Sequence, residues 1–538
     1  MRFLPLLIAV LSSVALSGPG TYRSVWITHV SPADLQALQA EGFDIESYRD
    51  SRARIYADAQ DEMRLEQMGF LPIPDETCFY EAAYPSLAAV NDTLEAIVAR
   101  HPGICRLENI GSSHGGRPIY AVVVSDNIGQ EEVEPEFRLI SAIHGDEKAG
   151  AMVALNFLRN LADNADTSPM CEYIVETAET WVIPILNPDG YVSNSRYNGN
   201  SVDLNRNLSY HWQSGGGYGS GPFSEPETRA LRDITMKNWP AQTGFENPFC
   251  ASMSLHGGEA CFNYVWNYSS AAVPDTALIV DMANDYAALC QVPGFWVTEG
   301  WAWYVITGDV NDWSYGEYGG IDHTIEVHLN KQYSDWPTLA AQHYMALLDF
   351  YVNSTYGFWG TVTNSYGNPL DANIQITRRD GSDSEPMRFC RTDITMGDYA
   401  KPALPGTYDV TATVAGFAPK TVSNVQLGPS ERVEVSFVFD PDGVEGGHSG
   451  VLQPLSLTAS ANPFSASVVL NCTTSLEGRL TIYDITGHSV FAAGIPAGGA
   501  AITWNGTTED GTPMPSGVYI ARLTDGSGIV SARLVRQN

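Results

Sequence analysis

The chain has 538 residues, of which 44% are hydrophobic and 17% are charged, so the composition excludes an intrinsically disordered protein and a coiled coil. This length accommodates roughly three or four domains of about 150 residues each. With 29 lysines and arginines against 62 aspartates and glutamates, the net charge is −33, which excludes a general electrostatic attraction to nucleic acid or to an anionic membrane.

Residues 1–17 have the pattern of a signal peptide. Arg2 precedes a mostly apolar run that ends at Leu16, and the small residues Ala15 and Ser17 match a cleavage site. The alternative is a membrane anchor, although the run is short for a bilayer span. Because no other stretch is apolar enough to cross a bilayer, the sequence predicts a protein without an integral membrane span, secreted or attached to the cell surface after bacterial export.

Eight cysteines are scattered along the chain without a Cys-x-x-Cys pair, which argues against a zinc knuckle and against a redox motif. An exported protein can form disulfides, and Cys250 and Cys261 are close enough in sequence to form one. The spacing does not fix the pairing, and all eight cysteines could equally be small buried hydrophobic residues.

Residues 18–74 form a small predicted α+β unit. Residues 25–30 and 53–57 have strand character, and helices follow them from Ser31 and over residues 62–68. The position of this unit before the largest domain suits a prosegment or an inhibitory domain, and it suits an ordinary structural extension equally well.

Residues 75–355 form the largest predicted domain. Strand-like runs alternate with helical stretches such as residues 149–161. This alternation predicts an α/β domain with a mixed, mostly parallel sheet and helices on both faces. The runs with strand character include Tyr120–Val124, Phe137–Ile143, Trp181–Ile185, Ala251–Leu255 and Thr324–Val327.

The remainder of the chain is predicted to be all-β. Residues 356–440 contain short strand-like runs separated by glycine and proline turns, which is typical of a β-sandwich. Residues 441–452 are rich in glycine and polar residues, which predicts a flexible linker. Residues 453–538 form a second predicted β-sandwich.

Two histidines and one glutamate are candidate metal ligands in the α/β domain. His144 follows an apolar strand and Glu147 begins the next helix, which is where open α/β sheets place their ligand sites. His256 also follows a strand, and two glycines come directly after it. Two imidazoles and one carboxylate suit zinc and leave a position open for water. Taken alone, His144 and Glu147 could be an ordinary surface pair.

Four polar residues between these ligands are candidates for substrate binding. Arg206 can form a bidentate pair with a carboxylate, and Asn205 can add a second donor. Asp203 can hold the outer nitrogen of a metal-bound histidine, and Arg196 can stabilise an oxyanion. Each arginine could instead be a solvated surface charge.

Glu326 lies inside a strand of the predicted buried sheet. An unpaired carboxylate is costly in such a position, so it indicates a functional group. The alternative is a glutamate at a strand end that faces solvent.

Several motifs together give the α/β domain a resemblance to the zinc metallocarboxypeptidases, in particular to the branch with a trailing β-domain. The resemblance covers about residues 78–355, and the motifs occur in the order and spacing of the family. They are His144-x-x-Glu147, Asn187-Pro188-Asp189-Gly190-Tyr191, Asp203-Leu204-Asn205-Arg206-Asn207, Leu255-His256-Gly257-Gly258, Asp312-Trp313-Ser314-Tyr315 and Thr324-Ile325-Glu326.

The resemblance implies one Zn²⁺ per catalytic domain and a role for each matching residue. His144, Glu147 and His256 would bind the zinc, and Glu326 would be the general base that activates water. The resemblance also implies residues that handle the substrate, which would be the C-terminus of a peptide or protein. These are Arg196 for the oxyanion, Asn205 and Arg206 for the terminal carboxylate, and Tyr315 as a mobile tyrosine that closes over the substrate.

One position departs from the pattern of the family members that release basic residues. In them an acidic residue follows the last zinc histidine by eleven positions, whereas this chain has Asn267 there. The resulting uncharged pocket leaves the preferred C-terminal residue open. Asp309 is a candidate substitute acid.

The two β-units also have resemblances. Residues 356–440 resemble the transthyretin-like domain that follows the catalytic domain in this branch. Residues 453–538 resemble the C-terminal sorting domains of type IX secretion cargo and the Ig-like fold of hook-capping proteins, through Asn462-Pro463-Phe464 and Ser516-Gly517-Val518-Tyr519. This second resemblance implies secretion machinery or a cell-surface attachment as a partner.

Two other functions are compatible with parts of the sequence. A zinc-dependent deacylase of the aspartoacylase-like group would use the same metal ligands, but the residues predicted to bind a terminal carboxylate favour a peptidase. A catalytically inactive surface binding protein is the other alternative. The presence of all three zinc ligands and of Glu326 argues against it.

Overall fold

The computed structural model describes residues 23–75, 84–237, 244–380, 386–440, 456–460, 463–474, 478–484, 489–508, 511–524 and 529–537. The predicted signal peptide, the predicted linker and Cys78 lie outside the described residues. The chain divides into two compact units, the first comprising Met1–Val433 with Phe437–Phe439 and the second Glu434–Ser436 with Asp440–Asn538.

The centre of the first unit is a mixed sheet of eight strands within the described residues, in the order β11-β10-β12-β9-β7-β8-β6-β5. The four adjacent strands β12, β9, β7 and β8 are parallel to one another. Strand β10 is antiparallel to β12, and β6 is antiparallel to both β8 and β5. The strands are β5 (Cys105–Ser112), β6 (Pro118–Val124), β7 (Glu136–Ser141), β8 (Glu179–Ile183), β9 (Ala251–His256), β10 (Ala260–Tyr264), β11 (Trp296–Glu299) and β12 (Ile321–Val327).

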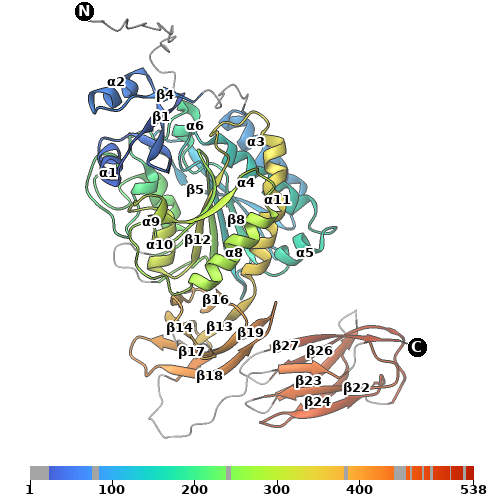
Figure 1. Ribbon diagram of the computed structural model, residues 1–538. Helices are drawn as coiled ribbons and strands as arrows, with labels where there is room; N and C mark the ends of the chain where they lie inside the picture. Colours follow the sequence, from blue (N-terminus) through green and yellow to red (C-terminus); the bar gives the residue numbers. More distant parts are fainter. Residues whose placement is uncertain are drawn as a thin grey trace, which may run out of the picture. The chain divides into compact units, whose positions relative to one another are not determined.

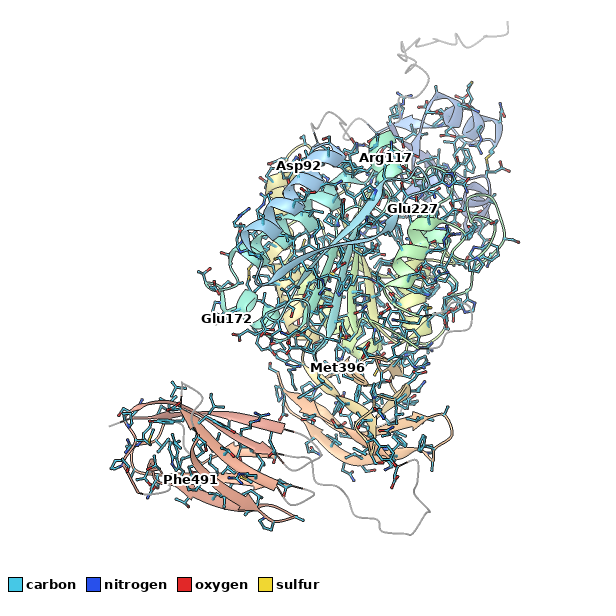
Figure 2. The ribbon with its side chains drawn as sticks, turned by 180° about the vertical axis from the view of Figure 1, so that it is seen from behind. Asp92, Arg117, Glu172, Glu227, Met396 and Phe491 are labelled. Carbon is cyan, nitrogen blue, oxygen red and sulfur yellow. The ribbon has the colours of Figure 1, made fainter. Side chains whose placement is uncertain are left out.

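Helices cover both faces of this sheet (Figure 1). On one face, apolar residues of α3, α4, α5, α8 and α11 share a core with the strands, and on the other face α7 and α10 do so. In Figure 2, Asp92 marks α3 and Glu227 marks α7, on opposite sides of the sheet. The helices are α3 (Leu87–Arg100), α4 (Lys148–Asp163), α5 (Pro169–Val175), α6 (Pro188–Ser193), α7 (Pro226–Asp233), α8 (Thr276–Leu289), α9 (Gly300–Trp303), α10 (Val310–Glu317) and α11 (Trp336–Ser354), with a 3-10 turn at Leu204–Arg206.

The N-terminal residues form a four-stranded antiparallel sheet in the order β2-β3-β1-β4, with two helices packed on it. Ser31 caps the first helix through a reciprocal pair of hydrogen bonds with Asp34. The elements are β1 (Arg23–Thr28), α1 (Pro32–Ala40), β2 (Asp44–Arg49), β3 (Arg52–Ala57), α2 (Ala59–Gln67) and β4 (Ile73–Pro74). The sequence predicted no strand at β2, because its polar residues hide the alternation on which such a prediction depends.

Residues 357–439 form two facing sheets of the first unit, with strand orders β16-β13-β19, where β20 also pairs with β13, and β15-β14-β17-β18. Their strands are β13 (Gly357–Asn364), β14 (Ala372–Arg378), β15 (Cys390–Arg391), β16 (Asp398–Pro402), β17 (Gly406–Val414), β18 (Lys420–Leu427), β19 (Arg432–Glu434) and β20 (Phe437–Phe439). Arg388 fastens these sheets to the α/β domain through hydrogen bonds to the backbone oxygens of Tyr315 and Gly316 on α10.

The second unit is all-β and has its own apolar core around Trp504. Its sheets have the strand orders β21-β22-β25 and β24-β23-β26-β27. The strands are β21 (Ser456–Ala459), β22 (Val468–Thr473), β23 (Gly478–Asp484), β24 (Ser489–Ile495), β25 (Ala500–Trp504), β26 (Gly517–Thr524) and β27 (Ile529–Arg536).

Two further observations bear on the sequence-based predictions. Cys250 and Cys261 are both buried free thiols, so the structure contains no disulfide between them. None of the helices in the described part of the chain has the length and apolar character that a membrane crossing requires.

Candidate metal centre and substrate pocket

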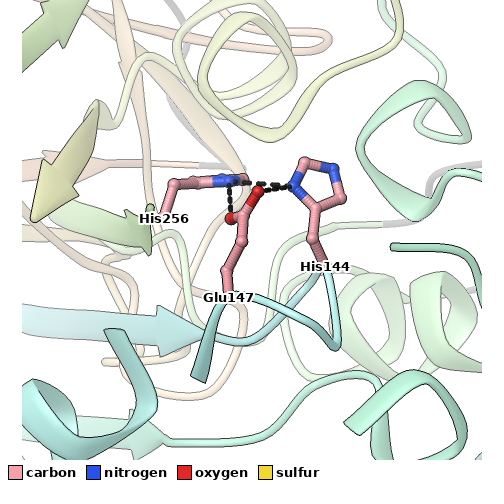
Figure 3. A group of neighbouring side chains, drawn as sticks. All are labelled: His144, Glu147 and His256. Carbon is pink, nitrogen blue, oxygen red and sulfur yellow. Dashed lines mark hydrogen bonds and ion pairs between the residues drawn. The ribbon is translucent and has the colours of Figure 1, made fainter. Parts of the chain in front are cut away.

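The three predicted zinc ligands, His144, Glu147 and His256, converge on one point (Figure 3). One ligand atom from each lies within 4.8 Å of the others, and all three residues are buried. Glu147 Oε1 is 2.9 Å from His144 Nδ1, and Glu147 Oε2 is 2.9 Å from His256 Nδ1. The two Nδ1 atoms are 3.2 Å apart. Both imidazoles therefore turn the same ring nitrogen toward a shared centre.

This set of donors fits zinc. Two imidazole nitrogens and one carboxylate leave a tetrahedral position free, as in catalytic zinc sites. The outer ring nitrogens are also held: His144 Nε2 lies 3.1 Å from Asp203 Oδ1, and His256 Nε2 lies 3.0 Å from Ser254 Oγ. Burial would raise the pKa of Glu147, but the two imidazoles outweigh burial and hold this pKa well below its ordinary value, so the carboxylate is ionised.

The ligands come from the carboxyl ends of two adjacent parallel strands. His144 lies shortly after β7, Glu147 precedes the first residue of α4, and His256 is the last residue of β9. The turn between His144 and Glu147 requires a glycine, since a Cβ on Gly145 would lie 1.9 Å from the backbone carbon of Gly190. The sheet and this tight turn together place the three donors.

Glu326 faces the metal ligands from the neighbouring strand. In β12 it is paired in register with His256 at the end of β9. Its Oε2 atom is buried and has no hydrogen-bond partner among the residues that the structure describes. Burial, and then the negative charge of Glu147, raise the pKa of Glu326 well above its ordinary value, which strengthens it as a proton acceptor.

The metal ligands and Glu326 line one pocket. The other residues that line it are Ile45, Glu46, Arg196, Asn205, Arg206, Gly257, Asn263, Asn267, Trp303, Tyr304, Ile306 and Thr324. The structure therefore brings together eight of the nine predicted site residues, either on the pocket wall or, for Asp203, directly behind His144.

Arg196 lies in the pocket wall between two carboxylates. Its Nε and Nη2 atoms each lie 3.0 Å from Asp203 Oδ2. Its Nη1 atom lies 3.0 Å from Oδ1 of Asp44, which belongs to the N-terminal strand β2. All three nitrogens of the guanidinium are therefore engaged in this state of the protein.

Arg206 differs from Arg196 in having free donors. Its Nη1 donates to the backbone oxygen of Asn205 at 2.7 Å, and it forms no ion pair within the described residues. The side chain of Asn205 is held at its Oδ1 atom, which accepts a hydrogen bond from the backbone N of Val310 at 3.0 Å. A carboxylate in the pocket can therefore pair with Arg206.

Tyr315 is the one predicted site residue that the structure keeps out of the pocket. It is fully buried on α10, where its hydroxyl donates to Asp275 Oδ2 at 2.9 Å and its ring packs on Trp266. A mobile role would require breaking this buried packing, so the prediction for Tyr315 needs correction. Tyr304, in the loop after α9, lines the pocket instead. The aromatic run that ends at Tyr304 was the available signal.

Asn267 lines the pocket as the resemblance implies, and Asp309 lies behind it. Asn267 Nδ2 donates to Asp309 Oδ1 at 2.7 Å, and both residues are buried. Asp309 is thus in contact with Asn267, which stands where the family members that release basic residues have an acid.

The N-terminal unit closes one side of the pocket. Ile45 and Glu46 of β2 line it, and Asp44 reaches Arg196 and also lies 2.5 Å from the ammonium of Lys331. Sequence reasoning found neither Asp44 nor Lys331, since the two are 287 positions apart and no local motif contains them.

Comparison with known proteins agrees with this geometry. Residues 90–347 match the family model for zinc carboxypeptidases. Carboxypeptidase SOL1 of Arabidopsis thaliana is 29% identical over 384 residues, which cover 65% of this chain and 72% of that protein. Carboxypeptidase D of Mus musculus is 28% identical over 381 residues, which cover 64% of this chain but only 26% of the longer mouse protein.

A solved structure supports the fold alone. The carboxypeptidase A from Helicoverpa armigera superposes with a TM-score of 0.51 and 16% identity, covering 61% of this chain and 96% of that one. The family model and the sequence relatives confirm the prediction of a zinc-dependent enzyme: residues 90–347 match the zinc carboxypeptidases, and the relatives support a metallocarboxypeptidase hydrolase that uses Zn²⁺.

Proposed function

We propose that this protein is an exported zinc carboxypeptidase that hydrolyses the C-terminal peptide bond of peptides or proteins, with Glu326 as the general base. The observation that carries the proposal is that Glu326 and the free donors of Arg206 line the same pocket as the three metal ligands. A cationic side chain that binds the terminal carboxylate beside the hydrolytic centre restricts cleavage to the last peptide bond of the substrate.

The residues of the pocket divide the chemistry among them. Bound Zn²⁺ would supply a Lewis acid that polarises the scissile carbonyl and lowers the pKa of water. Glu326 accepts a proton from the attacking water and passes it to the leaving amine. Arg196 stabilises the negative charge that develops on the carbonyl oxygen. Asn205 and Arg206 hold the terminal carboxylate of the substrate.

Tyr304 takes the substrate-covering role that the sequence assigned to Tyr315. It follows a short helix in an aromatic loop and lines the pocket together with Arg196 and Arg206. From this position its ring can pack over a substrate that Arg206 holds by the carboxylate.

Replacement of Arg206 tests exopeptidase action. We expect Arg206→Gln to lower kcat/KM for peptides with a free C-terminus by about 10- to 100-fold, because a hydrogen bond to a charged group is lost. Arg100→Gln on α3 is the matched control, since Arg100 is half exposed and pairs only with Asp163 at the surface. Equal cleavage of free and amidated peptides by the unchanged protein would contradict the proposal and favour a deacylase.

We also propose that the N-terminal unit is an inhibitory prosegment. Three observations support this role: Ile45 and Glu46 occupy the pocket wall, Asp44 engages the arginine that would stabilise the oxyanion, and α1 reaches the loop of Tyr304 through a hydrogen bond from Gln39 Nε2 to the Val305 oxygen at 3.3 Å. The part of a peptide that precedes the scissile bond would compete with β2 for this space.

Export and surface attachment complete the proposal. Residues 1–17 have the composition of a signal peptide, and the C-terminal β-unit resembles sorting domains of secretion cargo. We expect the exported protein to begin at Gly18, which mass spectrometry of its N-terminal peptide measures directly. An exported chain that retains Met1 would contradict cleavage and favour an anchor.

A further inference from the structure

The pocket continues beyond Glu326 along two paired strands. Thr324 lies two positions before Glu326 on β12, so both side chains point to the same face of the sheet. Asn263 on β10 is the register partner of Thr324, and Asn267 follows β10. Thr324, Asn263 and Asn267 all line the pocket and are all buried. This part of the wall is therefore polar but carries no charge of its own.

Asp309 determines which atom of the Asn267 side-chain amide faces the pocket. Its Oδ1 accepts hydrogen bonds from Asn267 Nδ2 at 2.7 Å and from the backbone N of Asp312 at 3.1 Å, the latter as the cap of α10. Because Asp309 Oδ1 accepts both of these hydrogen bonds, Asn267 turns its NH₂ group toward Asp309. The carbonyl oxygen of the Asn267 amide is then left for a ligand.

The surroundings keep Asn267 in this orientation. Its backbone N donates to both carboxylate oxygens of Asp312, at 2.9 and 3.1 Å, and its backbone oxygen accepts from Ile306 N at 3.2 Å. Gly300 makes room for the amide oxygen, because a Cβ at this position would lie 1.7 Å from Asn267 Oδ1. These contacts exclude a rotation of the Asn267 backbone and a larger residue in place of Gly300.

Thr324 shows the same polarity. Its hydroxyl donates to Asn311 Oδ1 at 3.1 Å, which leaves the lone pairs of the hydroxyl oxygen for a ligand. Asp309 adds a buried carboxyl group behind these acceptors. It is 1% exposed, and its second oxygen, Oδ2, is buried without a hydrogen-bond partner in the described part of the chain. A ligand that brings N–H groups would compensate this arrangement of unpaired acceptors.

We propose that this end of the pocket receives the C-terminal side chain of the substrate and selects side chains that end in N–H donors. Ammonium, guanidinium and primary amide groups share this chemistry. Asp309 is the positioning residue that sets the preference, since it holds Asn267 with its carbonyl oxygen toward the substrate. The inference rests on the proposed carboxypeptidase function and names its substrate class.

The full-length variant Asp309→Ser tests the assignment. Serine caps helices as well as aspartate does, so α10 is retained, but its hydroxyl can also donate a hydrogen bond and no longer fixes the orientation of the Asn267 amide. The substrates are matched peptides that end in Lys, Gln or Met, and kcat/KM is measured for each. We expect the unchanged protein to prefer Lys and Gln over Met by about tenfold or more. The variant should lose most of this preference, so that its ratios of kcat/KM for Lys over Met and for Gln over Met fall toward one.

A double variant separates charge from orientation. Asp309→Ser combined with Asn267→Asp moves the carboxylate into the pocket wall, which should restore the release of Lys but not of Gln. Asp335→Ser is the matched control, because Asp335 caps α11 through Thr338 N and does not line the pocket. All substitutions are made in the wild-type chain and in the Asp44→Asn chain, so that inhibition by the N-terminal unit does not hide a preference.

The outcomes distinguish the two levels of the proposal. Release of all three residues with the same ratios before and after Asp309→Ser would overturn the role of Asp309 and leave the carboxypeptidase function standing. Preferred release of Met by the unchanged protein would overturn the substrate class. No release from any peptide, in either background, would overturn the proposed function together with the preference.

Discussion

Replacement of Glu326 by glutamine should lower kcat by about 10²–10⁴-fold while zinc stays bound. Glutamine has the size of glutamate but cannot accept the proton of the attacking water. Glu326 faces the metal ligands from the adjacent strand without being one of them, so the three donors of the metal site remain intact. The measurements are initial rates on peptides with free C-termini and metal analysis of the purified chain.

Glu259→Gln is the control for this experiment. Glu259 lies next to β10 and close enough to influence the charge of Glu326, but it does not line the pocket. We expect its rate to remain close to that of the unchanged protein. Activity of Glu326→Gln within tenfold of wild type would disprove the assignment of the base, and loss of zinc would make Glu326 a ligand instead.

Removal of the Asp44 charge should activate the enzyme. Breaking a buried ion pair costs about 3–5 kcal/mol. If half of this cost falls on the arrangement in which the N-terminal unit closes the pocket, the population with the pocket open rises about tenfold or more. We therefore expect Asp44→Asn to raise kcat/KM on peptides by at least about tenfold. Steady-state rates on the full-length chain measure this effect, with thermal unfolding as a check of the fold.

The matched variant is Asp50→Asn, in the same N-terminal unit. Asp50 is largely exposed and lies 3.8 Å from Arg49, so its loss removes one negative charge without touching the pocket. Its rate should equal that of the unchanged protein. If Asp44→Asn lowered the rate, Asp44 would be a supporting group for Arg196 and the N-terminal unit a permanent wall of the active site.

The sequence was sufficient to locate the metal ligands and Glu326 because each follows from a local pattern. His144 and His256 stand at the ends of apolar strands, and Glu147 begins the helix that follows the first of them; a parallel sheet brings such strand ends to one edge. Glu326 lies within a strand whose residues are all buried, which makes an acid conspicuous. The order of strands and helices gave these residues as candidates, and the resemblance of the motifs to a known family supplied their expected roles.

The sequence failed where a role depends on which way a side chain faces or on a distant partner. Tyr315 and Tyr304 both belong to aromatic stretches near the same motif, but only the packing of α10 shows that Tyr315 is enclosed. The strand β2 was missed because Asp44 and Glu46 look like surface residues, whereas they are buried against Lys331 and Arg54 of other segments. The pairing of Asp44 with Lys331, 287 positions away, leaves no local trace in the sequence.

The burial of Lys331 has a consequence for how the N-terminal unit can be displaced. This side chain is 1% exposed and lies between Asp44 and Asp146. Burial alone would lower its pKa, but Asp146 and Asp44 raise it well above the ordinary lysine value. Mobile ions screen attractions between charges that water surrounds, and they barely reach enclosed ones. Changes of ionic strength would therefore leave the ion pairs of Lys331 with Asp44 and Asp146 intact, and the protein would keep the same arrangement in a dilute and in a saline medium.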